Sequence, residues 1–200
     1  MDNRTEKAST LVLRAKKTIA DIGGLEVVGT IFKMISTELK SMKYKEDDTS
    51  VDPYKKNTHN AEIDYKIETL LPAGARLLES FYQGNTMITE DDKKILFGEP
   101  PSEPEKRKVA NPNENFADMI LSRNPTLTPI EQTLVEVEDR YEAEIEKMRH
   151  LKNEGHIKPD EIDKSYAITD LYRRDLLALR TIFQEAGTYL GRIKYGRGAA

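Results

Sequence analysis

The side chains best suited to catalysis or metal binding lie far apart in this sequence. It contains three histidines, His59, His150 and His156, and no cysteine. A zinc site needs histidine, cysteine or carboxylate ligands at short, regular spacing, often from one face of a helix. His150 follows Glu146 by four residues, which is the spacing of an ordinary charge pair on a helix. The histidines therefore predict no metal site.

Carboxylates are plentiful, and one cluster, Asp47, Asp48 and Asp52, offers the oxygen ligands that calcium prefers. The cluster lacks the central glycine and the terminal glutamate of a calcium-binding loop, so we interpret it as a solvated acidic loop. A di-iron site in a helical bundle would need Glu-x-x-His steps on two helices, and this sequence contains none. The carboxylates thus predict neither kind of metal site.

Motifs for nucleotide binding and for an activated serine are also missing. Gly23, Gly24 and Gly29 do not follow a predicted strand, and no Lys-Ser/Thr pair comes after them as in a phosphate-binding loop. No Gly-x-Ser-x-Gly turn occurs to expose a nucleophilic serine. The sequence predicts a protein that is not an enzyme and needs no cofactor. An all-α enzyme whose carboxylates meet only in the fold is one alternative.

Both ends of the chain are basic. Five cations lie within the first 17 residues, and no acidic residue follows Glu185. Cations interleaved with tyrosines can contact phosphates and stack on bases, but they equally suit a solvated helix end, where they meet the negative pole of the helix dipole. Nucleic-acid binding is therefore our alternative function. Its candidate contacts are Arg192, Lys194, Tyr195 and Arg197.

The composition favours a helix-rich soluble protein. One residue in three is charged, the formal net charge is only −4, and the 200 residues include no tryptophan. A chain of this length buries a core without needing a disulfide or a metal. The polar start MDNRTEKAST does not resemble a secretory signal, and no run of 18 apolar residues indicates a membrane span. We expect a cytoplasmic protein, or one in a particle assembled there, with no membrane association.

Apolar residues at helical spacing predict two helices at the start of the chain, over residues 5–22 and 25–42. Gly23 and Gly24 provide the left-handed stop that ends the first helix. So short a connection leads us to expect that the two helices pack antiparallel. The polar run that follows, residues 43–60, is interpreted as a loop.

Two further helices complete the first part of the chain. Apolar residues line up over 63–82, but Pro72 lacks a backbone donor and predicts a break or kink at Leu71. A short helix follows, with Thr89 as its N-cap and acidic residues in its first turn. These elements predict a small helical domain over residues 1–98.

A proline-rich stretch then divides the chain. Six of the nine prolines fall between Pro100 and Pro129. Together with the charged sequence SEPEKRK, they keep residues 99–126 from burying enough apolar surface to order themselves, so we interpret this stretch as a linker. One helical turn within it is expected to cover the edge of a core or to recruit a partner. That turn comprises Phe116, Met119, Ile120 and Leu121.

The clearest pattern lies in the last third of the chain. Thr128 and Glu131 have the spacing of a capping box, and Pro129 takes the first helical position, so a helix is expected to begin here. Its apolar residues repeat at close to 3.5 residues, the coiled-coil period. This first seam consists of Leu127, Ile130, Leu134, Val137, Tyr141, Ile145, Met148 and Leu151.

A second helix is expected after Pro159, with apolar residues that step by four and three without interruption. The first helix is mainly acidic and the chain after it mainly basic, which favours their pairing. We therefore predict a long antiparallel hairpin, held mostly by burial of its two seams. The second seam consists of Tyr172, Leu176, Leu179, Phe183, Ala186, Leu190 and Ile193.

These patterns predict an all-α protein: a helical bundle over residues 1–98, a linker over 99–126 and a coiled-coil-like hairpin with a basic tail over 127–200. Since we find no motif for catalysis, a metal or a cofactor, we expect function to reside in surfaces. The expected function is that of a structural subunit or adaptor in a larger cellular or viral assembly, which self-associates or binds a protein partner. The apolar seams of the hairpin are the expected interface.

Overall fold

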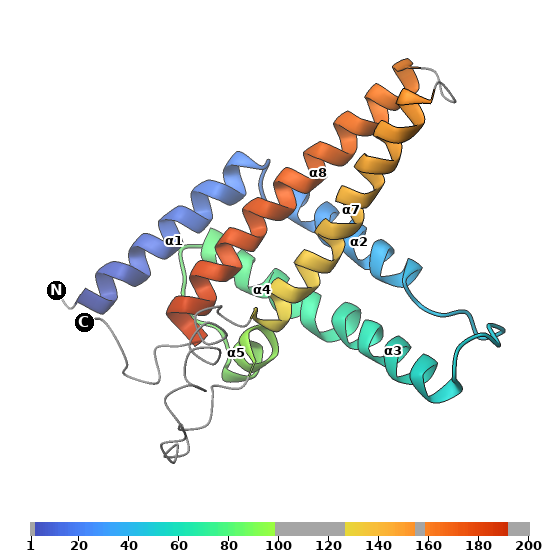
Figure 1. Cartoon of the computed structure of the whole chain (residues 1–200). Coiled ribbons are helices and arrows are strands. Elements are labelled where there is room, and N and C mark those ends of the chain that lie inside the picture. The colour runs from blue at the N-terminus through green and yellow to red at the C-terminus, as the bar shows by residue number, and fades with distance from the viewer. Residues whose placement is uncertain (1–2, 99–126, 155–158, 192–200) are drawn as a thin grey trace, which may run out of the picture.

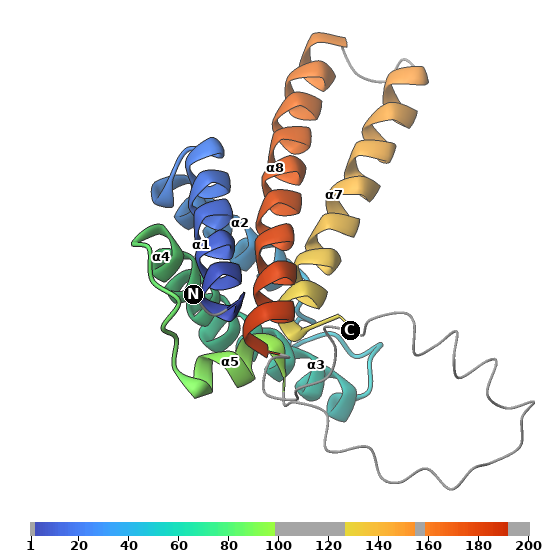
Figure 2. The ribbon, with the colours of Figure 1, turned by 90° about the vertical axis from the view of Figure 1, so that its left-hand side faces the viewer.

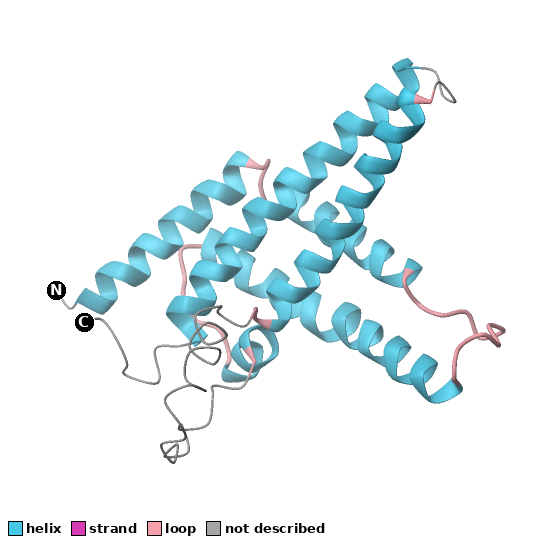
Figure 3. Ribbon diagram, in the orientation of Figure 1, coloured by secondary structure: helices cyan, strands magenta, loops and turns pink. Residues whose placement is uncertain are grey.

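Figures 1 and 2 show the structure from two sides; it is a computed structural model that describes residues 3–98, 127–154 and 159–191. Every regular element in these ranges is a helix and none is a strand (Figure 3). The prediction of an all-α fold is thus confirmed. None of the described helices is both long and apolar enough to cross a membrane. The predicted linker, with its proposed helical turn, lies outside the described residues.

The first two helices, α1 (Asn3–Asp21) and α2 (Leu25–Ser41), are joined by the expected glycine turn. Gly23 and Gly24 have φ angles of 109° and 86°, in the region that glycine adopts far more readily than other residues. A Cβ atom at Gly23 would also lie only 2.7 Å from Val27 Cγ2. Backbone angle and close approach together require glycine at position 23.

The predicted antiparallel packing of α1 and α2 is wrong. The two helices leave the turn in different directions and make few contacts with each other (Figure 1). Instead, α1 packs against α4 (Leu71–Tyr82) and α8 (Pro159–Ala186), and α2 packs mainly against α4. A short connection keeps two helix ends close, but the apolar faces that the helices bury decide the angle between them.

The next helix consists of three consecutive parts, α3 (Pro53–Tyr65), the π turn η1 (Lys66–Leu70) and α4. Residues 53–60 of its first part lie in the polar run 43–60 that we interpreted as a loop. That interpretation is wrong for these residues, whereas residues 43–52 do form a loop. The Asp52 carboxylate caps α3 by accepting hydrogen bonds from the Tyr54 and Lys55 N–H groups at 2.9 and 3.1 Å. This cap and the proline at the first helical position determine where the helix begins. The helix has no apolar stripe from which it could be predicted.

The break predicted at Leu71 takes the form of a widened turn. Leu71 keeps helical angles, φ −63° and ψ −43°, so the helix is not interrupted there. Its N–H donates to the Lys66 carbonyl five residues back, which is the hydrogen bond of a π helix. Pro72 has no N–H, and its ring needs space near the carbonyl four residues earlier. The π turn before the proline accommodates that ring without ending the helix.

Helix α5 (Glu90–Phe97) begins at the predicted cap, where Thr89 Oγ1 accepts a hydrogen bond from the Asp92 N–H at 3.0 Å. The buried Asp92 carboxylate binds the Arg76 guanidinium of α4 at N–O distances of 2.5 and 3.3 Å. This guanidinium lowers the pKa of Asp92, although burial of the carboxyl acts in the opposite direction. The pair attaches α5 to α4.

Helix α7 (Pro129–Asn153) begins with the predicted capping box: Thr128 Oγ1 accepts from the Glu131 N–H, and Glu131 Oε2 accepts from the Thr128 N–H at 2.9 Å. It lies beside α8 and runs in the opposite direction (Figure 2). A π turn, η2 (Gly187–Gly191), follows α8 directly. One half of the α7–α8 pair packs among the other helices, and the other half extends beyond them (Figures 1 and 2).

One hydrophobic core includes residues of both parts of the chain. Buried side chains from each described α-helix belong to it. At its centre, a Cβ atom added to Gly74 of α4 would lie 3.2 Å from Phe183 Cζ, 3.4 Å from Phe32 Cζ and 3.6 Å from Ile130 Cδ1. Helices α2, α4, α7 and α8 therefore meet at this glycine. The described parts of residues 1–98 and 127–200, which we predicted as two domains, contribute to the same core.

Candidate interaction surface on helices α7 and α8

The two predicted seams are buried by the chain's own helices. Phe183, Leu179 and Val137 have no exposed surface. Five more seam residues of the expected interface belong to the core. Leu134, Tyr141 and Leu176 are buried there, and Tyr172 and Leu190 are partly buried. Further along α7, Ile145 is buried and Met148 is half-buried, while Ile193 lies outside the described residues. Because the described seam side chains pack inside the chain, the surface available to a partner consists of other, exposed residues.

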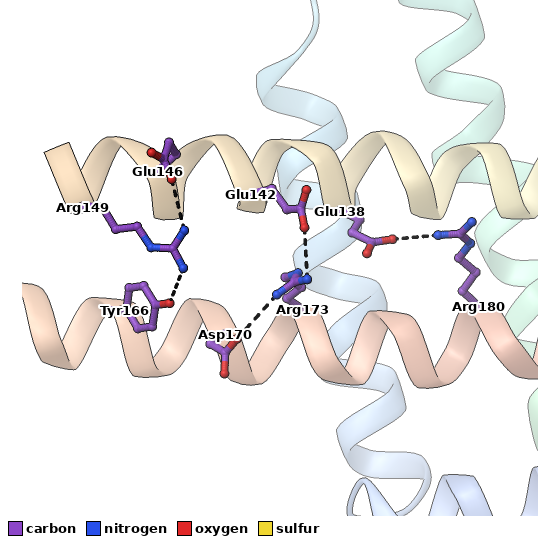
Figure 4. A network of polar contacts seen from close by, with 8 residues as sticks. All are labelled: Glu138, Glu142, Glu146, Arg149, Tyr166, Asp170, Arg173 and Arg180. Atoms are coloured by element: carbon purple, nitrogen blue, oxygen red, sulfur yellow. Dashed lines mark hydrogen bonds and ion pairs between the residues drawn. The ribbon is translucent and has the colours of Figure 1, made fainter.

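Two ion pairs join α7 to α8 near the core (Figure 4). Arg180 Nη1 lies 3.1 Å from Glu138 Oε2, and Arg173 Nη2 lies 3.1 Å from Glu142 Oε1. Arg173 also reaches Asp170 on its own helix at 3.8 Å. In both interhelical pairs the acid belongs to α7 and the base to α8, as the charge difference between the two stretches predicts.

The charge pattern reverses toward the far end of the pair. Arg149 of α7 donates to the Tyr166 hydroxyl of α8 at 2.9 Å (Figure 4), and Lys152 donates to Asp163 at 2.5 Å. Each contact further along α7 uses a residue earlier in α8, so all four contacts agree on one antiparallel register. Exposed contacts of this kind contribute only about 0–1 kcal/mol each, and they specify register more than stability.

The outer half of the pair is an arm that stands apart from the core. In α7 the core ends at Tyr141, and in α8 it begins at Tyr172. None of the described residues 142–153 and 163–171 belongs to it, and this part extends beyond the other helices (Figure 2). We call these two segments the arm. Ile145 of the arm is buried although it lies outside this core.

An exposed apolar stripe runs along the α8 side of the arm. Among the arm side chains that the structure describes, Ile168 and Leu171 are the large apolar ones that are exposed, each at 54 %. Lys164, four residues before Ile168, and Asp175, four residues after Leu171 and just beyond the arm, extend the same helix face. We call these four residues the arm stripe. Further along this face, Ile182 is buried, in the half of α8 that packs among the other helices.

The two charged residues of the arm stripe are unpaired among the residues that the structure describes. Lys164 is exposed, and Asp175 is half-buried, which raises the pKa of its carboxyl through desolvation. Their neighbour Arg174, by contrast, lies 2.7 Å from Asp170. The stripe thus presents one free cation, two aliphatic side chains and one free anion in sequence.

The arm stripe had a signal in the sequence that the longer seam obscured. Ile168, Leu171, Asp175, Ala178 and Ile182 step by three, four, three and four residues. This is the spacing of the α8 seam, on a neighbouring face of the helix. A helix with two such faces has more apolar surface than a single partner helix covers.

The basic ends offer less for an interface in the part that can be described. Arg192, Lys194, Tyr195 and Arg197 lie outside the described residues. In α1, Arg14 Nη1 lies 3.4 Å from Glu185 Oε1 of α8. The ammonium of Lys16 lies 5.9 Å from the centre of the ring of Tyr82. These two N-terminal cations therefore already take part in contacts within the chain.

The acidic loop has structural roles. Asp48 accepts hydrogen bonds from the Ser50 N–H at 2.9 Å and from its hydroxyl at 2.5 Å, which lower the pKa of Asp48, while Asp52 caps α3. His59 Nε2 lies 3.0 Å from the Met42 carbonyl oxygen. In the described ranges, no three histidine or acidic side chains gather closely enough to hold a metal ion.

An open groove of about 480 Å³ lies between α2 and the η1–α4 part of the long helix. Phe32, Ile67 and Leu71 contribute apolar surface, and Lys33 and Lys40 contribute positive charge. Among the described residues that line it, the titratable side chains are these two lysines, with no carboxylate or imidazole beside them.

Comparison with protein-family models, with curated proteins and with solved structures finds no match to this chain.

Proposed function

We propose that this protein is a non-enzymatic helical subunit or adaptor of a larger assembly, and that it binds a protein partner through the arm stripe. The exposure of Ile168 and Leu171 on a projecting helical arm is the observation that carries the proposal. Both side chains lie one helical turn apart, where a partner helix could cover them together.

The energetics of the arm favour a partner. Burying the exposed half of an aliphatic side chain of this size stabilises a complex by about 1 kcal/mol. Two helices alone bury one face each, and long helical pairs commonly complete a bundle by adding helices from another chain. A third or fourth helix on the arm stripe would continue the packing that Ile182 already has near the core.

The titratable groups support a binding role over catalysis. The groups whose pKa is shifted lie on different elements, for example Asp92 on α5, Tyr141 on α7 and Asp175 on α8. A catalytic site would bring several such groups together in one cleft. Each shift here has a local cause, which is an ion pair for Asp92 and burial for the other two.

Site-specific photocrosslinking tests the proposal. A photoreactive phenylalanine derivative replaces Leu171 in the full chain, which is then irradiated in an extract of the cells that produce it. We expect the group at position 171 to form a covalent adduct with the protein that covers the stripe. The matched control carries the same group at Lys147, which is exposed on α7. Equal labelling from the two positions, or none from either, would contradict a binding role for the stripe.

A further inference from the structure

We infer that the arm stripe binds a second copy of this chain, with the two α8 helices antiparallel across a twofold axis. The inference rests on the proposed function, because it names the partner of the same surface. It is carried by the order of the four stripe residues, Lys164, Ile168, Leu171 and Asp175, which is complementary to itself when reversed.

The spacing of the stripe fits an antiparallel helix pair. Its residues are separated by four, three and four positions, which is the alternation of the two apolar positions in a coiled coil. A twofold axis between Thr169 and Asp170 would bring Ile168 of one copy opposite Leu171 of the other. Both aliphatic side chains of each copy are then covered by the same contact.

The same axis pairs the free charges. It places Lys164 of one copy opposite Asp175 of the other, twice per dimer. Both groups lack a partner among the described residues of their own chain, so the dimer supplies each with a counter-charge. A parallel arrangement would instead set lysine beside lysine and aspartate beside aspartate, which is unfavourable at an interface. The charges therefore select the antiparallel arrangement.

The length of the stripe sets the strength of the contact. From Lys164 to Asp175 the helix rises about 16 Å, at roughly 1.5 Å per residue. A contact of this length buries less surface than the roughly 1,200–2,000 Å² of a standard stable interface. We therefore expect a dimer that dissociates on dilution. Because each copy uses the same surface, association stops at two copies.

Charge exchange tests the pairing. Sedimentation equilibrium of the full chain over a range of concentrations gives the dimer dissociation constant for wild type, Lys164→Glu, Asp175→Lys and the double variant. Each single variant creates two like-charge contacts per dimer, and we expect it to raise the dissociation constant by roughly tenfold. The double variant restores both pairs with exchanged signs, so its dissociation constant should return toward the wild-type value. Circular dichroism melting curves verify that the variants fold.

Disulfide cross-linking tests the direction of the two helices. Because the chain has no cysteine, single cysteines can be placed at will: a tagged Ile168→Cys variant is mixed with an untagged Leu171→Cys variant and oxidised. The antiparallel dimer predicts that the mixed disulfide forms in excess over both symmetric ones. Lys147→Cys serves as the control for random collision.

Several results would overturn the inference: a chain that stays monomeric at every concentration, symmetric disulfides in excess over the mixed one, or a double charge variant as weak as the single variants. A monomeric chain whose position 171 still crosslinks to a different protein would overturn the second-copy partner and leave the proposed function in place. Absence of both self-association and crosslinking would remove both proposals.

Discussion

Gly74 on α4 lies directly against Phe183 on α8, so closely that a Cβ atom at position 74 would come within 3.2 Å of Phe183 Cζ. Phe32 Cζ lies 3.4 Å from the same point. Both rings are in the core, where close packing leaves little freedom to move aside. This contact is where the N-terminal helices meet the α7–α8 pair.

Replacing Gly74 with alanine should therefore destabilise the protein. The added methyl group would crowd Phe183 at 3.2 Å, and overpacking of this kind costs about 1–3 kcal/mol, which exceeds the roughly 0.5–1 kcal/mol that alanine gains over glycine in a helix. Urea denaturation of Gly74→Ala and wild type measures the difference in the free energy of unfolding.

The matched control is Gly29→Ala in α2, where an added Cβ meets no atom within 4 Å. Alanine there should stabilise the helix by about 0.5–1 kcal/mol, because glycine is the weaker helix former. Equal stability of Gly74→Ala and wild type would contradict the close contact between α4 and α8.

The ion pair between Glu138 and Arg180 should stabilise the α7–α8 contact measurably. Their side chains are 12 % and 34 % exposed, so water screens the pair less than at the surface. A double-mutant cycle to alanine should give a coupling free energy of about 1 kcal/mol. The same cycle on Arg14 and Glu185, a more exposed pair, should give a few tenths at most. Similar coupling free energies in both cycles would contradict the claim that the greater burial of the Glu138–Arg180 pair strengthens it.

The Arg76–Asp92 pair predicts a specific loss of stability in acid. Because the pKa of Asp92 is lowered in the folded state, the unfolded chain binds this proton more readily. The stabilisation is present above the unfolded pKa, about 4, and is lost as the pH falls through the lower folded value. Asp92→Asn should remove this dependence.

Unfolding free energies of wild type and Asp92→Asn, measured from about pH 7 to about pH 2.5, test the effect. Their difference should shrink as the pH falls. Asp91→Asn, an exposed substitution one residue earlier, is the control. A constant difference between wild type and Asp92→Asn across this range would contradict the expected shift.

Tyr141 predicts the opposite pH dependence at the alkaline end. Burial raises its pKa to about 12, while a tyrosine in the unfolded chain ionises near 10. Its contribution to stability is therefore complete below about pH 10 and is lost as the pH rises toward 12. Tyr141→Phe should unfold with a shallower pH dependence in this range, as followed by circular dichroism. Tyr54→Phe, at an exposed tyrosine, is the control and should leave the dependence unchanged.

Local signals in the sequence predicted the helix ends that short-range hydrogen bonds determine. The capping box at Thr128 and the cap at Thr89 involve residues three positions apart, so their chemistry can be read directly. The start of α3 at Asp52 was missed, since that helix has little apolar periodicity and depends on its cap. The π turn before Pro72 was anticipated only as an irregularity.

Tertiary relationships were harder to predict, because a periodic stripe shows that a face is buried but not what covers it. The seam of α7 and α8 was identified as a buried face, yet its contact with the N-terminal helices through Gly74 has no sequence signature. The angle between α1 and α2 depends in the same way on their shared packing against α4. The arm stripe became recognisable only once the structure separated covered from exposed residues.

Sedimentation velocity of wild type and the double variant Ile168→Asp, Leu171→Asp at increasing concentration tests self-association through the arm most directly. We expect the wild-type sedimentation coefficient to rise with concentration and that of the variant, with an unchanged melting temperature, to stay at the monomer value. Leu13→Asp, at an exposed leucine of α1, should behave like wild type. Identical concentration dependence of wild type and the stripe variant would contradict the assignment of association to the arm.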